Sequence, residues 1–113
     1  MVKENKLKVS EESFQRTVID LAHTYGYKVA HFRKARKSNG DWITPVGADG
    51  KGWLDLILAN KDKRDFIVAE LKSEDGKMTK EQKMWFGTLK QCCHSVYVWR
   101  PSDYEDIVLR LKR

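Results

Sequence analysis

The segment WLDLILANKDKRDFIVAELK, residues 53–72, decides the fold. It contains two apolar runs, residues 53–59 and 66–72, which are joined by the polar connection 60–65. Apolar runs of this length, rich in branched residues and separated by a short polar loop, predict two strands of an antiparallel hairpin. Because both runs are apolar at nearly every position, they are typical of central strands that are covered on both faces.

The sequence before the hairpin predicts one helix and one further strand. Ser10 can cap a helix over residues 11–25, and residues 27–33 alternate as a strand does. The apolar face of this helix has the spacing of a packed helix and consists of Phe14, Val18, Leu21, Ala22 and Tyr25. Residues 1–9 are polar and basic, and we expect a flexible arm there. Residues 34–52 hold four of the seven glycines and one of the two prolines, which predicts a long loop.

The sequence after the hairpin predicts two helices with a strand between them. Thr79 and Gln82 have the spacing of a capping box and open the first of these helices. Residues 96–99 form a short strand, and Ser102 and Glu105 have the spacing of a second capping box. The predicted order is therefore α-β-β-β-α-β-α, which is an α/β fold.

The length and composition fit one domain, residues 10–113, with a modest core. The chain has 113 residues, a hydrophobic content of 41% and four each of Trp, Tyr and Phe, which is globular rather than disordered. Its net charge of +6, from 22 basic and 16 acidic residues, favours an anionic partner such as nucleic acid or an anionic membrane surface. A basic surface that only increases solubility is the alternative.

The sequence shows no targeting or membrane segment. No apolar run approaches the length of a membrane span, which excludes the membrane-spanning class. The first residues carry Lys3, Lys6 and Lys8 without the apolar stretch that a secretory signal requires. We therefore expect a cytoplasmic protein, in the host cytoplasm if the chain is viral.

Two acids and a lysine interrupt the apolar strands of the hairpin. Glu70 and Lys72 share one face of their strand, because side chains alternate along it. If the hairpin closes symmetrically, Ala59 lies opposite Phe66 and Asp55 lies opposite Glu70, with Cβ atoms about 4.5–5.5 Å apart. Two carboxylates at this distance repel each other, so that one takes up a proton or a cation lies between them. Their oxygens suit Mg²⁺ or Mn²⁺.

A divalent metal would give these side chains a use in phosphodiester hydrolysis. Such a metal lowers the pKa of a bound water and stabilises the charge of the transition state. Lys72, on the same face, can orient the water or neutralise the phosphate. The alternative is a Glu70–Lys72 ion pair at a frayed strand end with a solvated Asp55, and the spacing alone does not decide between the two interpretations.

Basic residues gather around the long loop that precedes Asp55. They are candidates for phosphate contacts that bring DNA to the metal, and they are Arg33, Lys34, Arg36, Lys37 and Lys51. Trp42 in the same loop can stack on an unpaired base. The alternatives are a solvated charged loop and, for Trp42, packing against the domain.

Four motifs, taken in order, resemble one known family. They are Gly52-Trp53-Leu54-Asp55-Leu56, Val68-Ala69-Glu70-Leu71-Lys72, Met78-Thr79-Lys80-Glu81-Gln82-Lys83-Met84-Trp85 and Val96-Tyr97-Val98-Trp99-Arg100-Pro101. Over residues 10–112 the chain resembles the virus-type replication-repair nucleases (VRR-NUC), a branch of the PD-(D/E)XK nuclease superfamily. The family usually has proline where this chain has Leu54; that proline contributes a rigid backbone and no metal ligand.

The resemblance implies a restriction-endonuclease-like core, with a central mixed β-sheet flanked by helices, and metal-dependent cleavage of DNA. It implies that Asp55, Glu70 and the backbone carbonyl of Leu71 hold Mg²⁺ or Mn²⁺, and that Lys72 is the catalytic lysine.

The resemblance also implies roles for two residues outside the hairpin. Glu12 is similar to an additional acid of the family, and Gln82 to a glutamine on the helix after the lysine strand. Glu12 can instead only favour a helix N-terminus, with Glu11 a rival for the same role. Gln82 can instead only close the capping box with Thr79.

Stand-alone nucleases of this type resemble structure-selective enzymes that cut branched DNA, including four-way (Holliday) junctions, commonly as homodimers. A dimer makes physical sense, because two strands are cut symmetrically and one domain has one site. Two alternatives remain from other classes: a non-catalytic nucleic-acid-binding module with the same fold, and a basic structural or interaction protein. The intact set of Asp55, Glu70 and Lys72 argues against a loss of catalysis.

Overall fold

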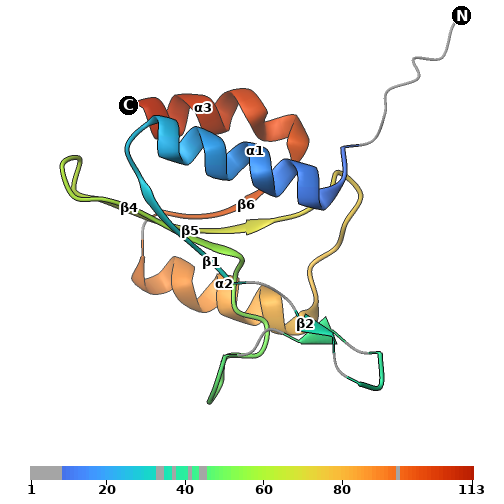
Figure 1. Ribbon diagram of the computed structural model, residues 1–113. Coiled ribbons are helices and arrows are strands. Elements are labelled where there is room, and N and C mark those ends of the chain that lie inside the picture. Colours follow the sequence, from blue (N-terminus) through green and yellow to red (C-terminus); the bar gives the residue numbers. More distant parts are fainter. Residues whose placement is uncertain (1–8, 33–34, 37, 41, 44–45, 94) are drawn as a thin grey trace, which may run out of the picture.

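A sheet of four strands runs through the protein and carries helices on both faces (Figure 1). The computed structural model describes residues 9–32, 35–36, 38–40, 42–43, 46–93 and 95–113. The strand order is β1-β4-β5-β6, with bounds β1 (Lys28–His31), β4 (Leu56–Asn60), β5 (Asp65–Leu71) and β6 (Val96–Trp99). The β5–β6 pair is parallel and the other pairs are antiparallel. The prediction of an α/β fold with a mixed sheet is confirmed.

The two central strands form the predicted hairpin. β4 and β5 pair with Ala59 opposite Phe66, which is the register expected from symmetric closure. The last five residues of β5 are all buried, as expected for a strand that is covered on both faces. β4 begins at Leu56 and not at Trp53, because the chain bends at Asp55.

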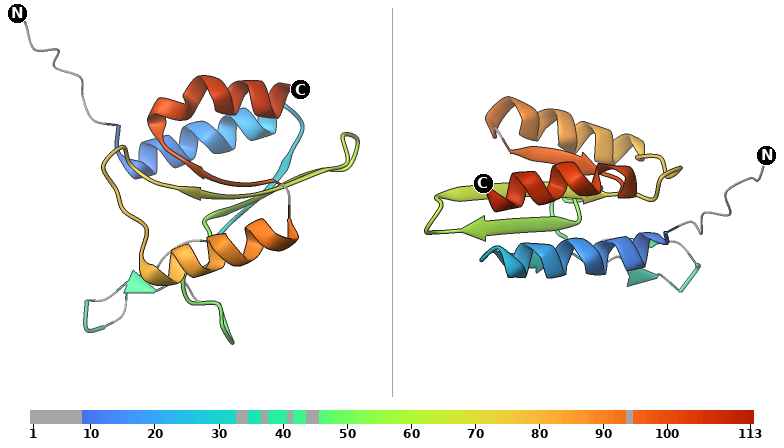
Figure 2. Two further views of the ribbon diagram at one scale, coloured as in Figure 1. Left: turned by 180° about the vertical axis from the view of Figure 1, so that it is seen from behind. Right: turned by 90° about the horizontal axis from the view of Figure 1, so that it is seen from above.

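The helices divide the protein into three layers. Helices α1 (Glu11–Thr24) and α3 (Tyr104–Lys112) cover one face of the sheet, and α2 (Lys80–Cys92) covers the other (Figures 1 and 2). The larger apolar core lies on the α1 and α3 side and consists of Phe14, Val18, Ala22, Tyr27, Leu56, Leu58, Ile67, Ala69, Leu71, Trp99, Ile107 and Leu111. A smaller apolar cluster, with three fully buried residues, lies on the α2 side: Leu54, Val68 and Val96.

Side-chain caps start the first two helices where the sequence predicts them. The Ser10 hydroxyl accepts a hydrogen bond from the Ser13 amide at 3.0 Å. Thr79 and Gln82 form a complete capping box at the start of α2. These bonds satisfy backbone amides that have no partner inside the helix.

The second predicted capping box is wrong. Pro101–Asp103 form a short 3₁₀ helix, and α3 follows it directly at Tyr104. The Ser102 hydroxyl donates a hydrogen bond to the Glu74 carboxylate at 2.8 Å and does not cap the helix. A proline just inside a helical turn presets the backbone, so the turn forms without a serine cap.

The predicted long loop is wrong in one part, because it contains two short strands. β2 (Ala35–Arg36) and β3 (Trp42–Ile43) pair antiparallel as a separate two-stranded sheet. Between them Gly40 has a φ of 94°, which a residue with a side chain adopts at a cost. The rest of the predicted order is as expected.

Two further expectations concern the chain outside this core. Residues 1–8, which make up nearly all of the predicted arm, lie outside the described residues. Among the helices that the structure describes, none combines the length and the apolar character that a membrane crossing requires.

Asp65, at the start of β5, joins three parts of the fold. Its carboxylate accepts hydrogen bonds from both terminal nitrogens of Arg110, at 2.7 and 2.8 Å, and from the Tyr27 hydroxyl. The hydrogen bonds from Arg110 lower the pKa of the Asp65 carboxyl to about 2. Burial, together with the hydrogen bond to Asp65, raises the pKa of the Tyr27 hydroxyl to about 12. The cluster ties α3 and the α1–β1 connection to the hairpin.

The substitution Asp65→Asn should remove a pH-dependent part of the stability. The ordinary pKa of an aspartate is about 4, so between about pH 4 and pH 2 the unfolded state binds more protons than the folded state. Wild-type stability therefore falls as the pH falls through this window, and the variant should lack this part of the fall. At neutral pH the variant should be less stable by about 3 kcal/mol, because Arg110 stays buried without its partner.

Urea unfolding followed by circular dichroism, from about pH 7 down to about pH 3, measures both effects. Asp62→Asn is the matched control, because Asp62 lies in the same connection but is exposed. Equal pH profiles for wild type and Asp65→Asn would contradict the prediction.

Candidate metal centre

Asp55 lies where β4 begins and is 2% exposed. Its backbone carbonyl accepts a hydrogen bond from the Phe32 amide at 2.8 Å, which extends the pairing with β1. Its side chain turns toward β5, where the Oδ2 atom accepts a hydrogen bond from the Leu71 amide at 2.8 Å. The residue therefore ties β4 to both of its neighbours at the point where the chain bends.

The register explains why a carboxylate is needed at this position. The β4–β5 ladder ends with Leu56 opposite Ala69, and its regular continuation would place Asp55 opposite Glu70 and Leu54 opposite Leu71. Because the chain bends, the Leu71 amide donates its hydrogen bond to the Asp55 carboxylate and not to a backbone carbonyl of the β4 strand. In an antiparallel pair the N–H and the C=O of one residue point to the same side. The Leu71 carbonyl thus points to the side of β5 on which Asp55 lies.

Glu70 is fully buried on the α2 face of the sheet. Its Oε2 atom accepts a hydrogen bond from the Gln82 side-chain amide at 2.9 Å and lies 3.2 Å from the Lys72 Nζ atom. The Lys72 side chain is itself only 7% exposed. The sequence left open an ion pair between Glu70 and Lys72 at a frayed strand end, with a solvated Asp55. The ion pair exists, but all three side chains are buried, so the frayed end and the solvated Asp55 are wrong.

Gln82 fulfils both roles that the sequence left open. Its side-chain oxygen accepts a hydrogen bond from the Thr79 amide at 2.9 Å, which closes the capping box. Its side-chain nitrogen donates to Glu70 at 2.9 Å. One amide thus fixes the first turn of α2 against the buried carboxylate.

The structure does not bring Glu12 to this group. Glu12 and its rival Glu11 lie in the first turn of α1, and Glu12 is exposed. In the described part of the chain, no three or more His, Cys, Asp or Glu side chains are grouped so that they could share a metal ion. The role of Glu12 as an additional acid stays a prediction.

The predicted DNA-binding residues are described only in part. Lys51 is strongly exposed, with 83% of its side chain accessible, and its Nζ atom lies 3.7 Å from the Glu81 carboxylate. Arg36 and Trp42 lie in β2 and β3, where the structure describes their backbone. The other three, Arg33, Lys34 and Lys37, lie outside the described residues.

A turn before Asp55 packs closely against the start of α2. Gly52 has a φ of 86°, and a Cβ atom placed on it would lie 2.5 Å from the Glu81 Cβ and 2.8 Å from the Gln82 amide nitrogen. The ring of the next residue, Trp53, packs edge to face with the Trp85 ring, and the two ring centroids are 5.0 Å apart. Only glycine fits here, so the turn and the helix that carries Gln82 are positioned together.

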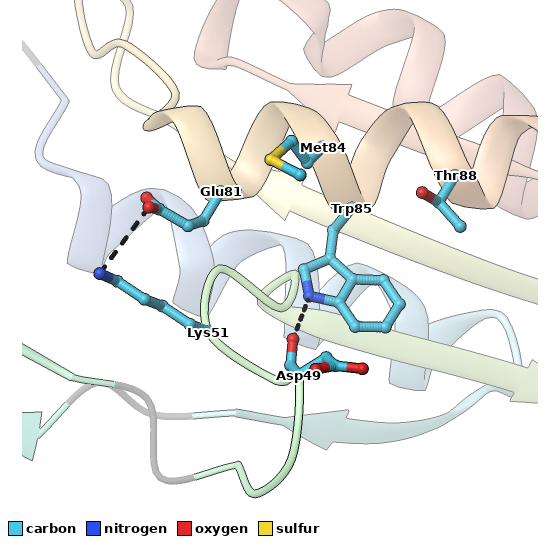
Figure 3. Close-up of a pocket in the computed structure, with 6 residues that line it drawn as sticks. All are labelled: Asp49, Lys51, Glu81, Met84, Trp85 and Thr88. Atoms are coloured by element: carbon cyan, nitrogen blue, oxygen red, sulfur yellow. Dashed lines mark hydrogen bonds and ion pairs between the residues drawn. The ribbon is translucent and has the colours of Figure 1, made fainter.

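An open cavity of about 400 Å³ lies between the loop that precedes Gly52 and helix α2 (Figure 3). It is lined by Asp49, Lys51, Glu81, Met84, Trp85 and Thr88. The Trp85 indole nitrogen donates to the Asp49 carbonyl at 3.0 Å, which fixes the loop to the helix. The cavity does not contain the buried acids, so it is separate from the candidate metal centre.

Arg100 holds the turn that follows Lys72, a role that the sequence analysis does not predict. One terminal nitrogen of its guanidinium donates to the carbonyls of Ser73 and Gly76, at 2.7 and 2.6 Å, in the turn after Lys72. A Cβ atom placed on Gly76 would lie 3.6 Å from the Lys72 Cδ, so this turn covers the lysine stem. The only signal in the sequence is a basic residue at the end of a strand, which says nothing of its carbonyl partners.

Comparisons with protein-family models, with curated proteins and with solved structures find no match to this chain. The resemblance to the VRR-NUC family therefore stays a prediction that depends on the four motifs. Leu54, the departure from the family pattern, is fully buried in the apolar cluster under α2, where a large apolar side chain is required.

The donor set fits a hard divalent cation. Asp55 and Glu70 offer carboxylate oxygens and Leu71 offers a carbonyl oxygen, and no cysteine or histidine is part of this set. Mg²⁺ is commonly bound through one or two carboxylates, with waters and substrate phosphates completing its coordination. These residues could therefore hold Mg²⁺ or Mn²⁺ without a third acid.

The substitution Gly52→Ala should destabilise the fold and loosen the candidate metal centre. The new methyl group would meet the backbone of α2, and an L-residue at this φ costs about 1–2 kcal/mol before any clash is counted. We expect a loss of about 2 kcal/mol or more in the free energy of unfolding, measured in urea. Gly47→Ala is the control, since no heavy atom lies within 4 Å of its added Cβ. Equal unfolding midpoints for the two variants would refute this packing role.

Proposed function

We propose that this protein is a metal-dependent, structure-selective DNA endonuclease that hydrolyses phosphodiester bonds, with branched DNA such as four-way junctions as its substrate. The observation that carries the proposal is the buried group of Asp55, Glu70 and Lys72, with the lysine amine 3.2 Å from the Glu70 carboxylate. Buried ionisable groups are costly for a fold of this size, and they concentrate at functional sites. The choice of branched DNA depends on the resemblance.

Each member of the group has a defined task in such a reaction. Asp55, Glu70 and the Leu71 carbonyl would hold Mg²⁺ or Mn²⁺, which when bound polarises the phosphate and lowers the pKa of a water. Lys72 brings a positive charge to the same face, where it can neutralise the phosphate or orient the attacking water. Its stem is packed under the Ser73–Gly76 turn, so the amine is held in one position.

Gln82 and Arg100 act through other residues and are positioning residues. Gln82 donates to Glu70 and thereby keeps one carboxylate oxygen oriented. Arg100 holds the turn that covers the Lys72 stem. Groups held by packing and by second hydrogen bonds lose little freedom when the substrate binds, which favours catalysis.

Substrate access sets a condition on this proposal. Asp55 is 2% exposed and Glu70 is fully buried, so a DNA phosphate reaches them only after part of the cover moves. We propose the Gly52 turn, which packs on the first turn of α2, as the part that moves. A symmetric cut in two strands also requires two sites, which favours a homodimer.

Cleavage assays test the proposal directly. A labelled four-way junction, a flap and a linear duplex are incubated with Mg²⁺, Mn²⁺ or EDTA, and we expect metal-dependent cuts that favour the branched substrates. Asp55→Asn, Glu70→Gln and Lys72→Met should each reduce the rate by about 100-fold or more. An asparagine at position 55 can still accept the hydrogen bond from the Leu71 amide. Asp55→Asn therefore tests the loss of the negative charge while the contact that supports the fold is kept.

Exposed acids provide the controls for this assay. Asp62→Asn should leave the rate unchanged, and Glu12→Gln compared with Glu11→Gln decides whether either helix acid takes part. The absence of cleavage of every substrate in both metals would reject the endonuclease. Binding of the junction without cleavage would instead favour the non-catalytic nucleic-acid-binding module.

Metal binding should also stabilise the folded protein. A ligand that binds only the folded state at 100 times its dissociation constant adds about 2.7 kcal/mol, so Mn²⁺ or Mg²⁺ should raise the thermal midpoint. Glu70→Gln should unfold at the same temperature with and without metal, whereas Asp62→Asn should behave as wild type. If metal shifts wild type and Glu70→Gln equally, it binds elsewhere.

A further inference from the structure

The outward face of α2 carries a row of exposed lysines. Lys80, Lys83 and Lys90, called the lysine row below, are all exposed and recur at the spacing of one helix face. The row spans about 15 Å of helix from its first to its last lysine. The inward face, with Gln82 and the apolar residues toward the sheet, lies on the other side of the same helix.

The lysine row is not neutralised within the described part of the chain. No carboxylate that the structure describes forms an ion pair with any of the three lysines. The single acid of α2, Glu81, lies outside the row and approaches Lys51 instead, at 3.7 Å. The row therefore presents free positive charge to solvent.

The other two helices present a different surface. The exposed charged residues of α1 are of both signs and comprise Glu12, Arg16 and Asp20. Those of α3 begin with two acids and comprise Glu105, Asp106 and Lys112. The positive charge on the helical surface of the domain is thus concentrated on the α2 layer, which is also the layer that contains the candidate metal centre.

The middle of the row is bare. Gly87 is exposed between Lys83 and Lys90, and a Cβ atom placed on it would meet no heavy atom within 4 Å. Glycine in a helix interior costs about 1 kcal/mol relative to alanine, and no packing contact explains it here. Lys90 lies with its Nζ atom 5.6 Å from the Phe86 ring centroid, which keeps its stem close to the helix. A chain of phosphates can therefore approach the helix closely between the lysines.

From this surface we infer that the lysine row binds the phosphate backbone of nucleic acid and guides it toward the end of α2 where Gln82 contacts Glu70. Charge complementarity selects the occupant, because a regular row of unpaired cations matches a regular row of phosphates. Lys51, which is exposed beside the first turn of α2 (Figure 3), lies next to Glu81 and is not part of the row. The inference rests on the proposed function for its choice of DNA.

Salt-dependent binding tests the inference without any cleavage. Fluorescence anisotropy in EDTA compares wild type with the triple variant Lys80→Gln, Lys83→Gln, Lys90→Gln on a labelled four-way junction. Each lost phosphate contact removes about 0.9 from the slope of log affinity against log salt, so the slope should fall by roughly 2–3. Near 0.1 M salt, the affinity should fall by about tenfold or more.

A matched triple variant separates the row from net charge. Lys28→Gln, Lys61→Gln, Lys112→Gln removes three exposed lysines that lie in β1, in the hairpin connection and at the end of α3. This control should keep nearly the wild-type slope. An equal loss in both triple variants, or no loss in the row variant, would overturn the inference.

Gly87 offers a second test that does not depend on removing lysines. Gly87→Ala should keep or increase stability and leave DNA binding unchanged, whereas Gly87→Glu should weaken binding by placing a carboxylate in the middle of the row. Unchanged binding by Gly87→Glu would count against the row as the contact surface.

Two further arms distinguish the possible failures. Vesicles that contain anionic lipid replace DNA in one arm, and binding to the vesicles but not to DNA would overturn the inference in favour of a membrane surface. In the other arm cleavage is measured; selective loss of binding in the row variant of a protein that cuts nothing would support the row and reject the endonuclease. Full cleavage with unchanged binding in the row variant would support the endonuclease and reject the lysine row as its DNA-binding surface.

Discussion

The burial of the Glu70 carboxylate constrains how the sheet and helix α2 are placed against each other. Removing a carboxylate from water costs several kcal/mol unless donors replace the lost hydration. One described donor, Lys72, is fixed by the alternation of the strand itself. The other, Gln82, belongs to α2 and reaches the carboxylate only if that helix starts in one place over the end of β5. The sheet and the helix layer are thus registered to each other through one buried charge.

The two faces of the sheet bury different kinds of side chain. On the α1 and α3 side, twelve buried residues form a continuous core. On the α2 side, positions that would otherwise extend the apolar cluster are taken by Glu70, Lys72 and Gln82, and the fully buried apolar side chains that the structure describes there are Leu54, Val68 and Val96. Apolar burial of about 25 cal/mol per Å² therefore stabilises mainly the first side. The α2 side gives up part of this stabilisation to position charged groups.

Much of this arrangement follows from the sequence, because its strongest patterns are local. The register with Ala59 opposite Phe66 follows from a symmetric hairpin, and the capping box of α2 follows from the spacing of Thr79 and Gln82. Of the residues that the sequence singles out, Glu70, Lys72 and Gln82 are in direct contact, and the Asp55 carboxylate accepts a hydrogen bond from the amide of Leu71, the residue after Glu70.

The missed features depend on tertiary contacts that leave no periodic pattern. The chain bends at Asp55, whose carboxylate replaces a backbone acceptor for the Leu71 amide, so β4 is shorter than its apolar run. Arg100 contacts backbone carbonyls, and every residue has one, so no partner residue marks its role. Ser102 was predicted as a helix cap because its alternative partner, Glu74, is distant in the sequence.

A buried donor without an acceptor in the described part of the chain lies two residues before Asp55. The Trp53 indole nitrogen is buried and has no hydrogen-bond acceptor among the residues that the structure describes, and such a donor costs about 1–3 kcal/mol. Its ring lies edge to face with both Phe32 and Trp85, so it holds the Gly52 turn against α2 through aromatic contacts. Movement of this turn away from α2 would expose the indole nitrogen to water and regain part of that cost. The same side chain thus stabilises the position of the turn by packing and limits how stable that position is, which agrees with the movement that the proposed function requires.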